Sequence, residues 1–334
     1  MVLKPVVALT MGDPAGIGPE IVVKTIASWD IEAVPLVIGD GGVLQEAQKR
    51  NTLRIAWREA HFPLRGDGPF LLDLKNVDFS SFSFGKISAE TGRASYEYIQ
   101  RAITLALEGQ VQGVVTAPIS KEALHRAGIP FIGHTEIFQS LSGVREAFTM
   151  FQVGELRVFF FTRHLALREA IARIKKDALV AFLRKMMVFL GVLRISEPRI
   201  AVAALNPHAG EGGLLGREEE EEISPAVLEL QKEGYRVSGP YPADSVFFFA
   251  SQGKFDAVLS LYHDQGHIAT KCLDFYRTVS VTLGLPFIRT SPDHGTAFDI
   301  AGQGVARHES MYEASRLAAF YALSYTLPLQ DQAP

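Results

Sequence analysis

The sequence predicts an α/β protein with a largely parallel sheet, because short apolar runs alternate with longer segments of helical periodicity. The predicted strands are 6–10, 35–39, 113–116, 156–161, 200–205, 257–261 and 279–283. The predicted helices are 19–28, 89–108, 176–193 and 217–232. The length of 334 residues allows two domains, and 47% hydrophobic residues can supply a sizeable core.

Local signals support the predicted helices. Pro19 and Glu20 fall in the first turn of the first helix, where both residue types are favourable. The helix 89–108 has apolar residues at core spacing and ends at Gly109. The acidic run that follows Arg217 is interpreted as the solvated start of a helix. Residues 60–87 lack helix signals and are expected to be extended.

Composition excludes several classes of protein. The net charge of −4 offers no basic face for nucleic acid. The single cysteine, Cys272, excludes an intrachain disulfide framework and fits a reducing compartment. No run approaches the ~20 apolar residues that span a bilayer, and residues 1–5 do not resemble a secretory signal. We therefore expect a soluble cytoplasmic protein.

Four histidines stand where apolar strands are predicted to end: His134, His164, His208 and His263. Imidazole is the commonest protein ligand for transition metals, and α/β proteins place their clefts at strand ends. The set therefore favours a metal-assisted active site. The alternative for each histidine is an ordinary hydrogen-bonded loop residue, since none follows a short metal-binding pattern.

Three further segments could bind a ligand. The glycine-rich segment 11–20 follows a strand and opens a helix, so it is either an anion-binding turn or a structural one. Ser120 either lines a pocket or caps a helix. The run 283–302 ends in a loop rich in Gly, Asp, His and Thr that could bind a dinucleotide. Arg289 and Lys271 could hold anions or form a structural ion pair.

Taken together, these segments resemble the 4-hydroxythreonine-4-phosphate dehydrogenase family. The matching segments are 12–20, 133–136, 206–211, 241–244, 263–266 and 282–302. The wider group is similar to isocitrate and isopropylmalate dehydrogenases, whose cofactor loop resembles 294–302. The resemblance implies a two-domain α/β/α sandwich with its active site in the interdomain cleft. We expect one domain at 1–128 plus 275–334, carrying the cofactor, and a metal-binding and dimerisation domain at 129–274.

The resemblance also implies a homodimer with shared active sites and assigns roles to residues. The implied metal ligands are His164 and His208 from one subunit and His263 from the other. The implied substrate contacts are His134, Thr135, Lys271, Ser280 and Arg289. The implied NAD contacts are Asp293, His294, Gly295, Thr296 and Asp299. Three imidazoles suit zinc best, would accept cobalt, nickel or manganese, and suit magnesium poorly. No arginine cluster for a 2′-phosphate stands out, which favours NAD over NADP.

The implied reaction is NAD-linked oxidation of 4-hydroxythreonine 4-phosphate, with decarboxylation of the β-keto acid, in pyridoxal phosphate biosynthesis. His208 and Lys271 are the expected catalytic residues, and the general base is either Lys271 or a metal-activated water. Ser280 stands where the biosynthetic enzymes have asparagine. This departure favours, as an alternative, a dehydrogenase of 4-phospho-D-threonate, 4-phospho-D-erythronate or a related hydroxy acid.

Two other classes remain open on the residues alone. A sugar-acid or nucleotide binding protein would need no set of histidines, so metal analysis separates it from the enzyme. Another enzyme class, such as an aldolase or hydrolase with a three-histidine metal site, would give the loop 294–302 no function. A measurement of NAD binding separates that class from the dehydrogenase.

Overall fold

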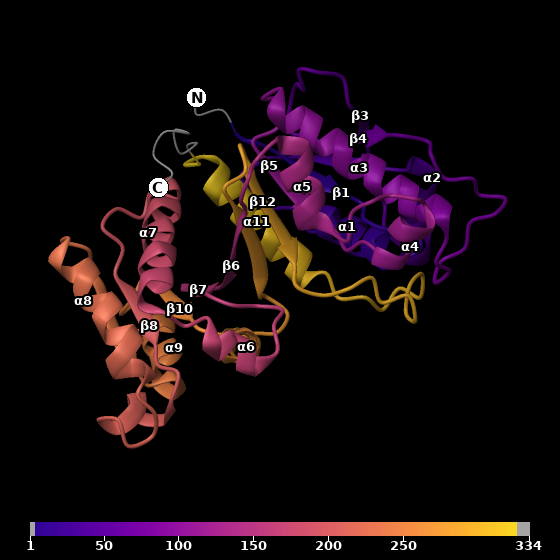
Figure 1. Ribbon diagram of the computed structural model, residues 1–334. Coiled ribbons are helices and arrows are strands. Elements are labelled where there is room, and N and C mark those ends of the chain that lie inside the picture. Colours follow the sequence, from indigo (N-terminus) through magenta and orange to yellow (C-terminus); the bar gives the residue numbers. More distant parts are fainter. Residues whose placement is uncertain (1–3, 326–334) are drawn as a thin grey trace. The chain divides into compact units, whose positions relative to one another are not determined.

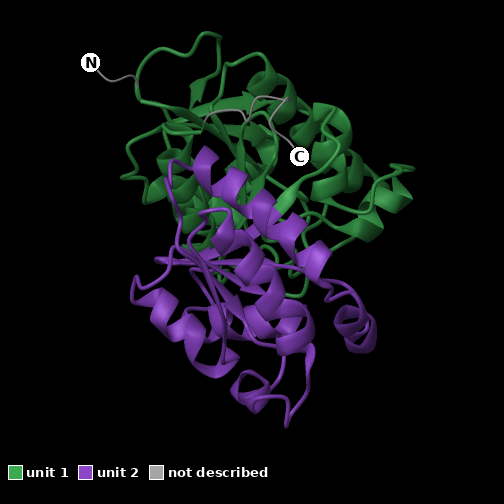
Figure 2. Ribbon diagram, turned by 60° about the vertical axis from the view of Figure 1, so that its left-hand side comes forward, with its two compact units in different colours: residues 1–148, 279–325 green, residues 149–278, 326–334 purple. Residues whose placement is uncertain are grey.

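The computed structural model describes residues 4–325. Among these, 4–148 and 279–325 form one compact unit, and 149–278 form a second (Figure 2). The sequence predicts the boundaries after residues 128 and 274, and the structure keeps 129–148 with unit 1. The reason is local, because the ring of Phe138 lies 6.1 Å from that of Phe287 in unit 1. Residues 1–3 and 326–334 of the predicted domains lie outside the described residues.

Unit 1 is built on a mainly parallel sheet. Its strands are β1 (Val6–Thr10), β2 (Val34–Gly39), β3 (Arg58–Glu59), β4 (Phe70–Asp73), β5 (Gly113–Thr116), β11 (Val279–Leu283) and β12 (Ile288–Pro292). They lie in the order β3-β4-β2-β1-β5-β12-β11. Only the β11–β12 pair is antiparallel. This arrangement confirms the predicted α/β class with a largely parallel sheet.

The helices of unit 1 form two layers over this sheet (Figure 1). They are α1 (Gly18–Ala27), α2 (Gly41–Arg50), α3 (Ala89–Leu107), α4 (Lys121–Arg126), α5 (His134–Ser142) and α11 (Glu309–Ala322). One layer joins α3 with α4 and α5, and the other joins α1 with α2 and α11. Both α3 and α11 contact the central strands β1 and β5, which explains why those strands are buried throughout or nearly so.

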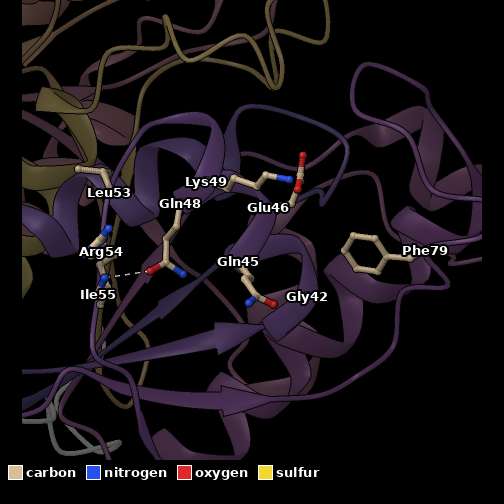
Figure 3. Close-up of a pocket in the computed structure, with 9 residues that line it drawn as sticks. All are labelled: Gly42, Gln45, Glu46, Gln48, Lys49, Leu53, Arg54, Ile55 and Phe79. Atoms are coloured by element: carbon tan, nitrogen blue, oxygen red, sulfur yellow. Dashed lines mark hydrogen bonds between the residues drawn. The ribbon is translucent and has the colours of Figure 1, made fainter.

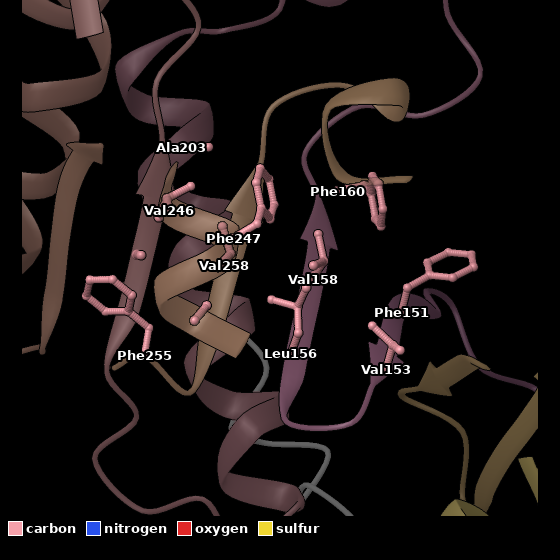
Figure 4. Close-up of a cluster of buried hydrophobic side chains, with 12 residues drawn as sticks. Phe151, Val153, Leu156, Val158, Phe160, Ala203, Val246, Phe247, Phe255 and Val258 are labelled. Atoms are coloured by element: carbon pink, nitrogen blue, oxygen red, sulfur yellow. The ribbon is translucent and has the colours of Figure 1, made fainter. Parts of the chain in front are cut away.

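Unit 2 has a smaller sheet in the order β6-β7-β10-β8-β9. Its strands are β6 (Phe148–Val153), β7 (Leu156–Phe160), β8 (Ile200–Ala203), β9 (Val237–Tyr241) and β10 (Ala257–Ser260). Its helices are α6 (Leu167–Ala172), α7 (Lys176–Val192), α8 (Ser224–Lys232), α9 (Ala243–Ser251) and α10 (His263–Leu273), with short turns at Pro207–Glu211 and Glu219–Ile223. Side chains of α9 and four strands form a buried apolar cluster that includes Val158 and Val246 (Figure 4).

Some elements depart from the sequence-based expectation. The run after residue 283 contains a complete strand, β12, which is buried along its whole length. The segment 60–87 agrees with the expectation of extended structure, since it contains the strand β4. Within 4–325, the structure contains no helix with the length and apolar character needed to cross a membrane.

Candidate functional site

The predicted site residues fall into two groups, one in each unit. In unit 1, four side chains share one face of the sheet. Thr10 pairs with Thr116 across β1 and β5, and Thr282 pairs with Arg289 across β11 and β12. Arg289 also reaches Thr116, which places both pairs on the same face. Ser280 lies two residues before Thr282 and so points to that face as well.

Arg289 is the central cation of this group. Its side chain is 4% exposed. Its guanidinium donates to Thr282 Oγ1 at 3.0 Å and to Thr116 Oγ1 at 2.5 Å, and it lies 5.5 Å from the ring centre of Phe138. Its Nε has no hydrogen-bond partner, and no carboxylate pairs with it anywhere in 4–325. Burial lowers the pKa of Arg289 to about 9, so the guanidinium is still charged at neutral pH.

A buried cation without a counter-ion is costly unless a ligand supplies the charge. The guanidinium fork matches a carboxylate or a phosphate. The expectation of an anion-holding Arg289 therefore has geometric support, and the alternative of a structural ion pair does not fit.

His134 adds a neutral polar group beside this cation. It begins helix α5, and its Nε2 is buried without a hydrogen-bond partner. Burial, reinforced by the charge of Arg289, holds the pKa of His134 well below its ordinary value. The ring is therefore a neutral imidazole that can donate one hydrogen bond to an anion. Thr135 follows it in the same first turn, where backbone N–H groups also favour an anion.

The predicted NAD contacts lie together in one loop of unit 1, between β12 and α11. Asp293, His294 and Thr296 are half-buried, and Gly295 and Asp299 are exposed. A side chain added at Gly295 would meet no atom within 4 Å, so the backbone here is open to a ligand. The loop is accessible and rich in polar atoms, which fits a dinucleotide contact.

In unit 2, two of the predicted metal ligands approach each other. The ring centres of His164 and His263 are 5.9 Å apart. Nδ1 of His263 lies 2.6 Å from Oδ1 of Asp264, which leaves Nε2 for another partner. A carboxylate on the far nitrogen is the usual support for a metal-binding imidazole. The ring of His267 packs against His263, with the ring centres 4.2 Å apart and the planes tilted by 37°, and it stacks on Phe160 at 4.5 Å, so His263 lies against an aromatic cluster.

His208 occupies an unusual backbone turn. It follows β8 and is exposed. His208 and Ala209 have φ angles of 53° and 55°, in the left-handed region that non-glycine residues avoid. Glu219 holds the base of the turn by accepting from the backbone N–H groups of Leu205 at 2.8 Å and Asn206 at 2.7 Å. Backbone strain kept in place by such bonds is typical of functional sites.

The three predicted ligands are not gathered into one cluster within the chain. Among residues 4–325, no group of three or more His, Cys, Asp or Glu side chains is arranged to hold a metal. A ligand set shared between two subunits stays a prediction. Lys271 lies on α10, with its Nζ 5.5 Å from the ring centre of Phe275.

Sequence reasoning missed several supporting residues. Ser120, for which the sequence left a pocket and a helix cap open, is a helix cap, since its Oγ accepts from Ala123 N at 3.1 Å. Glu219 was hidden in an acidic run interpreted as solvated, yet it is 2% exposed. Phe138 and Thr282 line the guanidinium of Arg289 but carry no motif of their own. The period-two alternation of side chains along β11 is the signal that places Thr282 on the same face as Ser280.

A further surface pocket lies elsewhere. Its volume is about 750 Å³, and it lies beside α2 in unit 1 (Figure 3). It is lined by Gly42, Gln45, Glu46, Gln48, Lys49, Leu53, Arg54, Ile55 and Phe79, none of which is a predicted site residue. Its charged side chains are of both signs, so the pocket does not select for an anion or for a cation.

The fold is a two-unit α/β fold, and comparison with known proteins identifies its family. Residues 32–318 match the family described as pyridoxal phosphate biosynthetic protein PdxA. The chain belongs to this family, which confirms the resemblance found in the sequence and the prediction that it is an enzyme.

Several relatives match almost the whole chain. A protein of Symbiobacterium thermophilum, provisionally named D-threonate 4-phosphate dehydrogenase, is 51% identical over 96% of this chain and 98% of its own length. A crystal structure of a 4-hydroxythreonine-4-phosphate dehydrogenase from Burkholderia phymatum is 43% identical, with a TM-score of 0.82 over 96% of this chain and 98% of that one. The corresponding Klebsiella pneumoniae enzyme is 40% identical, with a TM-score of 0.84 over the same shares.

Proposed function

We propose that this enzyme is an NAD-linked, metal-dependent dehydrogenase that oxidises D-threonate 4-phosphate at C3 and releases its C1 carboxylate as carbon dioxide. The observation that carries the proposal is Arg289, a buried and charged guanidinium whose hydrogen-bond partners within residues 4–325 are two threonine hydroxyls and no carboxylate. A substrate with a carboxylate and a phosphate supplies the anion that this cation lacks.

The choice among family substrates rests on two further points. The Symbiobacterium thermophilum relative named for D-threonate 4-phosphate is 51% identical to this chain, whereas the two compared structures named for 4-hydroxythreonine 4-phosphate are 43% and 40% identical. Ser280 also shares the sheet face of Arg289. The two substrates differ at C2, which carries a hydroxyl in one and an amine in the other. A short serine hydroxyl next to the anion subsite suits a hydroxyl at that carbon.

The overall reaction balances without another reactant. D-Threonate 4-phosphate and NAD yield dihydroxyacetone phosphate, carbon dioxide and NADH. When bound, NAD accepts the hydride from C3, and a divalent metal polarises the C3 hydroxyl as a Lewis acid. The hydroxyl proton must leave during oxidation, and a proton must reach C2 after the C1–C2 bond breaks. We assign both transfers to Lys271.

In unit 1, side chains hold the substrate. Arg289 binds one anionic group, and the neutral imidazole of His134 donates a hydrogen bond beside it. Thr135 contributes its hydroxyl from the same helical turn. Because these groups are largely buried before the substrate arrives, little reorganisation is needed when it binds, and positioning of this kind can lower the barrier by several kcal/mol.

In unit 2, the residues fit a metal. We propose His164, His208 and His263 as ligands of a divalent ion, with zinc favoured by an all-imidazole set. The support is the 5.9 Å spacing of the His164 and His263 rings and the carboxylate of Asp264 behind His263. Since the three rings are not gathered in one chain, we propose a homodimer in which two subunits complete each set. The exposed apolar side chains Ile268 and Phe275, beside these ligands, support a subunit contact on unit 2.

A second candidate substrate is 4-hydroxythreonine 4-phosphate, favoured by the names of the two compared crystal structures. The test is NADH formation from each compound, and from 4-phospho-D-erythronate, with metal-stripped enzyme resupplied with zinc, cobalt, manganese or magnesium. We expect kcat/KM for D-threonate 4-phosphate to exceed that for the amino compound by about 10-fold or more, the size of effect typical of one mismatched polar group. The opposite preference would select the second candidate, and no NADH from any compound would reject the proposed function.

A further inference from the structure

We infer that Glu20 and Lys24 of helix α1 position the loop 293–306 and thereby set the affinity of the enzyme for NAD. The inference rests on the proposed function, in which this loop contacts NAD. Neither residue is among the predicted site residues, and the sequence analysis gave Glu20 no role of its own beyond a favourable helix start.

Glu20 binds the end of the loop through its backbone N–H groups. The side chain is 3% exposed. One carboxylate oxygen accepts from Ala306 N at 2.7 Å, and the other accepts from Gly304 N at 3.2 Å. Both amides belong to a segment without regular structure, so they have no partner in a helix or sheet.

Lys24 completes the arrangement one helical turn later. Its Nζ lies 2.7 Å from Glu20 Oε1 and donates to the carbonyl oxygens of Gly304 at 3.0 Å and Ala306 at 2.7 Å. The pair therefore binds the N–H and the C=O of the same two loop residues. Charged groups make stronger hydrogen bonds than neutral ones, and more so when they are buried.

The first part of the loop, at Thr296, contacts the turn that leads into helix α1. Ile17 N donates to Thr296 O at 2.9 Å, and a side chain at Gly16 would lie 3.0 Å from Thr296. Between the two ends, Arg50 Nη1 donates to Gly302 O at 3.0 Å. Helix α1 and the turn that begins it thus hold both ends of the segment 296–306, which carries the proposed NAD contacts Thr296 and Asp299.

The predicted consequence is a change in NAD affinity. A loop that is ordered before binding loses less conformational entropy when the ligand arrives. Without the pair, the segment 297–306 would lose four hydrogen bonds at Gly304 and Ala306 and keep its internal turns, the contact of Arg50 and its packing against Phe84, so NAD would have to order more of it. The substrate-holding side chains lie on strands and on α5, so their affinity for the substrate should not change.

The test is the variant Lys24→Met, which keeps the length of the side chain but removes its charge and its three donors. We expect faster hydrogen exchange at the amides of 297–306 in the ligand-free protein. We also expect the Kd for NADH, followed by its fluorescence, to rise about 10-fold, the order of effect of a lost set of loop-ordering contacts. The KM for the phosphorylated substrate should stay the same. Lys24→Arg, which keeps the charge, should recover part of the affinity.

A matched control is Arg316→Met. Arg316 pairs with Glu313 on the surface of α11 in the same unit, at 2.8 Å, and does not contact the loop. It should leave both the exchange and the Kd unchanged. If Lys24→Met does not fold, Glu20→Gln, which removes the charge but keeps the shape, is measured in the same way.

The two proposals fail differently. If the natural sequence does not bind NADH, the proposed function is rejected. If it binds NADH and the folded variant binds it equally well, with unchanged exchange in 297–306, the role of Glu20 and Lys24 is rejected and the proposed function stands.

Discussion

The two groups of candidate residues differ in how far they are prepared before a ligand arrives. In unit 1, Arg289 is 4% exposed and rests on threonine hydroxyls and the ring of Phe138. In unit 2, His164 and His208 are exposed, and His263 is half-buried, with Asp264 at its Nδ1 and the ring of His267 against it. The first group therefore needs only an anion, whereas the second needs an ion and further ligands to become a defined site.

This difference follows from the positions of the residues along the chain. Arg289 and Thr282 lie inside strands, where neighbouring strands fix the backbone and the side chains alternate between faces. His164 and His208 follow strands, in loops that only a few hydrogen bonds hold. We expect the sheet-borne group to affect stability as well as activity, and the loop-borne group to affect activity and metal binding alone.

The largest effect is expected for His208→Ala. It removes a proposed metal ligand from an exposed turn, so NADH formation should fall by about 1000-fold, or ~4 kcal/mol of barrier, with loss of bound metal. The unfolding temperature should hardly change. Activity is measured with the preferred substrate, and metal content by elemental analysis of the purified protein.

The control for this variant is His61→Ala, which removes an imidazole whose side chain is 80% exposed and which lies far along the chain from every predicted ligand. It should retain both metal and activity. If His208→Ala also retains metal and activity, the assignment of His208 as a ligand is wrong. The comparison of an anion-binding group in unit 1 with a metal-binding group in unit 2 then fails.

The next effect is expected for Arg289→Met. The substrate loses its cationic partner, so KM should rise by about 100-fold, in line with a lost charged hydrogen-bond pair of about 3 kcal/mol. The unfolding temperature should rise, because the variant no longer buries a charge without a counter-ion. Thermal unfolding with and without phosphate measures both effects. Phosphate should stabilise the natural sequence but not the variant. A fall in unfolding temperature together with an unchanged KM would show that Arg289 is structural.

Much of the fold could be predicted from the sequence, because its signal is periodic. The strand Val6–Thr10 and the helix Ala89–Leu107 lie within a residue of their predicted ends, since apolar spacing and the glycine at 109 mark them. The strand Ile288–Pro292 escaped prediction because Arg289 and two hydroxyl residues interrupt its apolar pattern. One of those interruptions, Arg289, is the central cation of the candidate site.

The supporting residues of the candidate site were harder to predict than the histidines and Arg289. Glu219 shares its sequence context with four neighbouring glutamates, and its burial separates it from them. Phe138 resembles any core aromatic residue until its ring is found beside a guanidinium. Such roles depend on contacts between segments far apart in the chain, and local patterns carry no information about them.

A third effect concerns the pH dependence of stability in unit 1. Burial raises the pKa of Asp13 from 3.8 to about 6, and its Oδ2 has no hydrogen-bond partner. The folded state therefore binds the proton more tightly than the unfolded state. The resulting cost of ionisation is absent below pH 3.8 and complete above about pH 6. It amounts to about 3 kcal/mol for a shift of roughly two units.

The variant Asp13→Asn removes this titration but keeps an acceptor for Ala15 N. Its advantage in unfolding free energy over the natural sequence should grow as the pH rises from about 4 to about 6 and then level off. Urea unfolding at several pH values measures it. An advantage that does not change with pH would mean that Asp13 keeps its ordinary pKa in the folded protein.

The smallest effect is expected for Glu219→Gln. This variant tests whether the buried carboxylate of Glu219 orders the turn that carries His208. Glu219 accepts from two backbone amides and, at 2.8 Å, from the side-chain amide of Asn206. Glutamine can replace one acceptor but turns an N–H₂ group toward other donors. The turn that carries His208 should loosen, and zinc affinity should fall about 10-fold, as is typical when the support of a ligand is lost.

The matched control is Glu220→Gln, which removes the same charge at the next, exposed position. Competition with a fluorescent zinc chelator gives the affinity of both variants, so any general effect of net charge cancels. A fall for both would assign the effect to the acidic surface, since the two variants change charge equally and only Glu219 touches the turn. A fall for Glu219→Gln alone would show that the buried Glu219 positions the exposed His208. The unit 2 histidines would then be partly held in place before a metal binds, as Arg289 is before an anion binds.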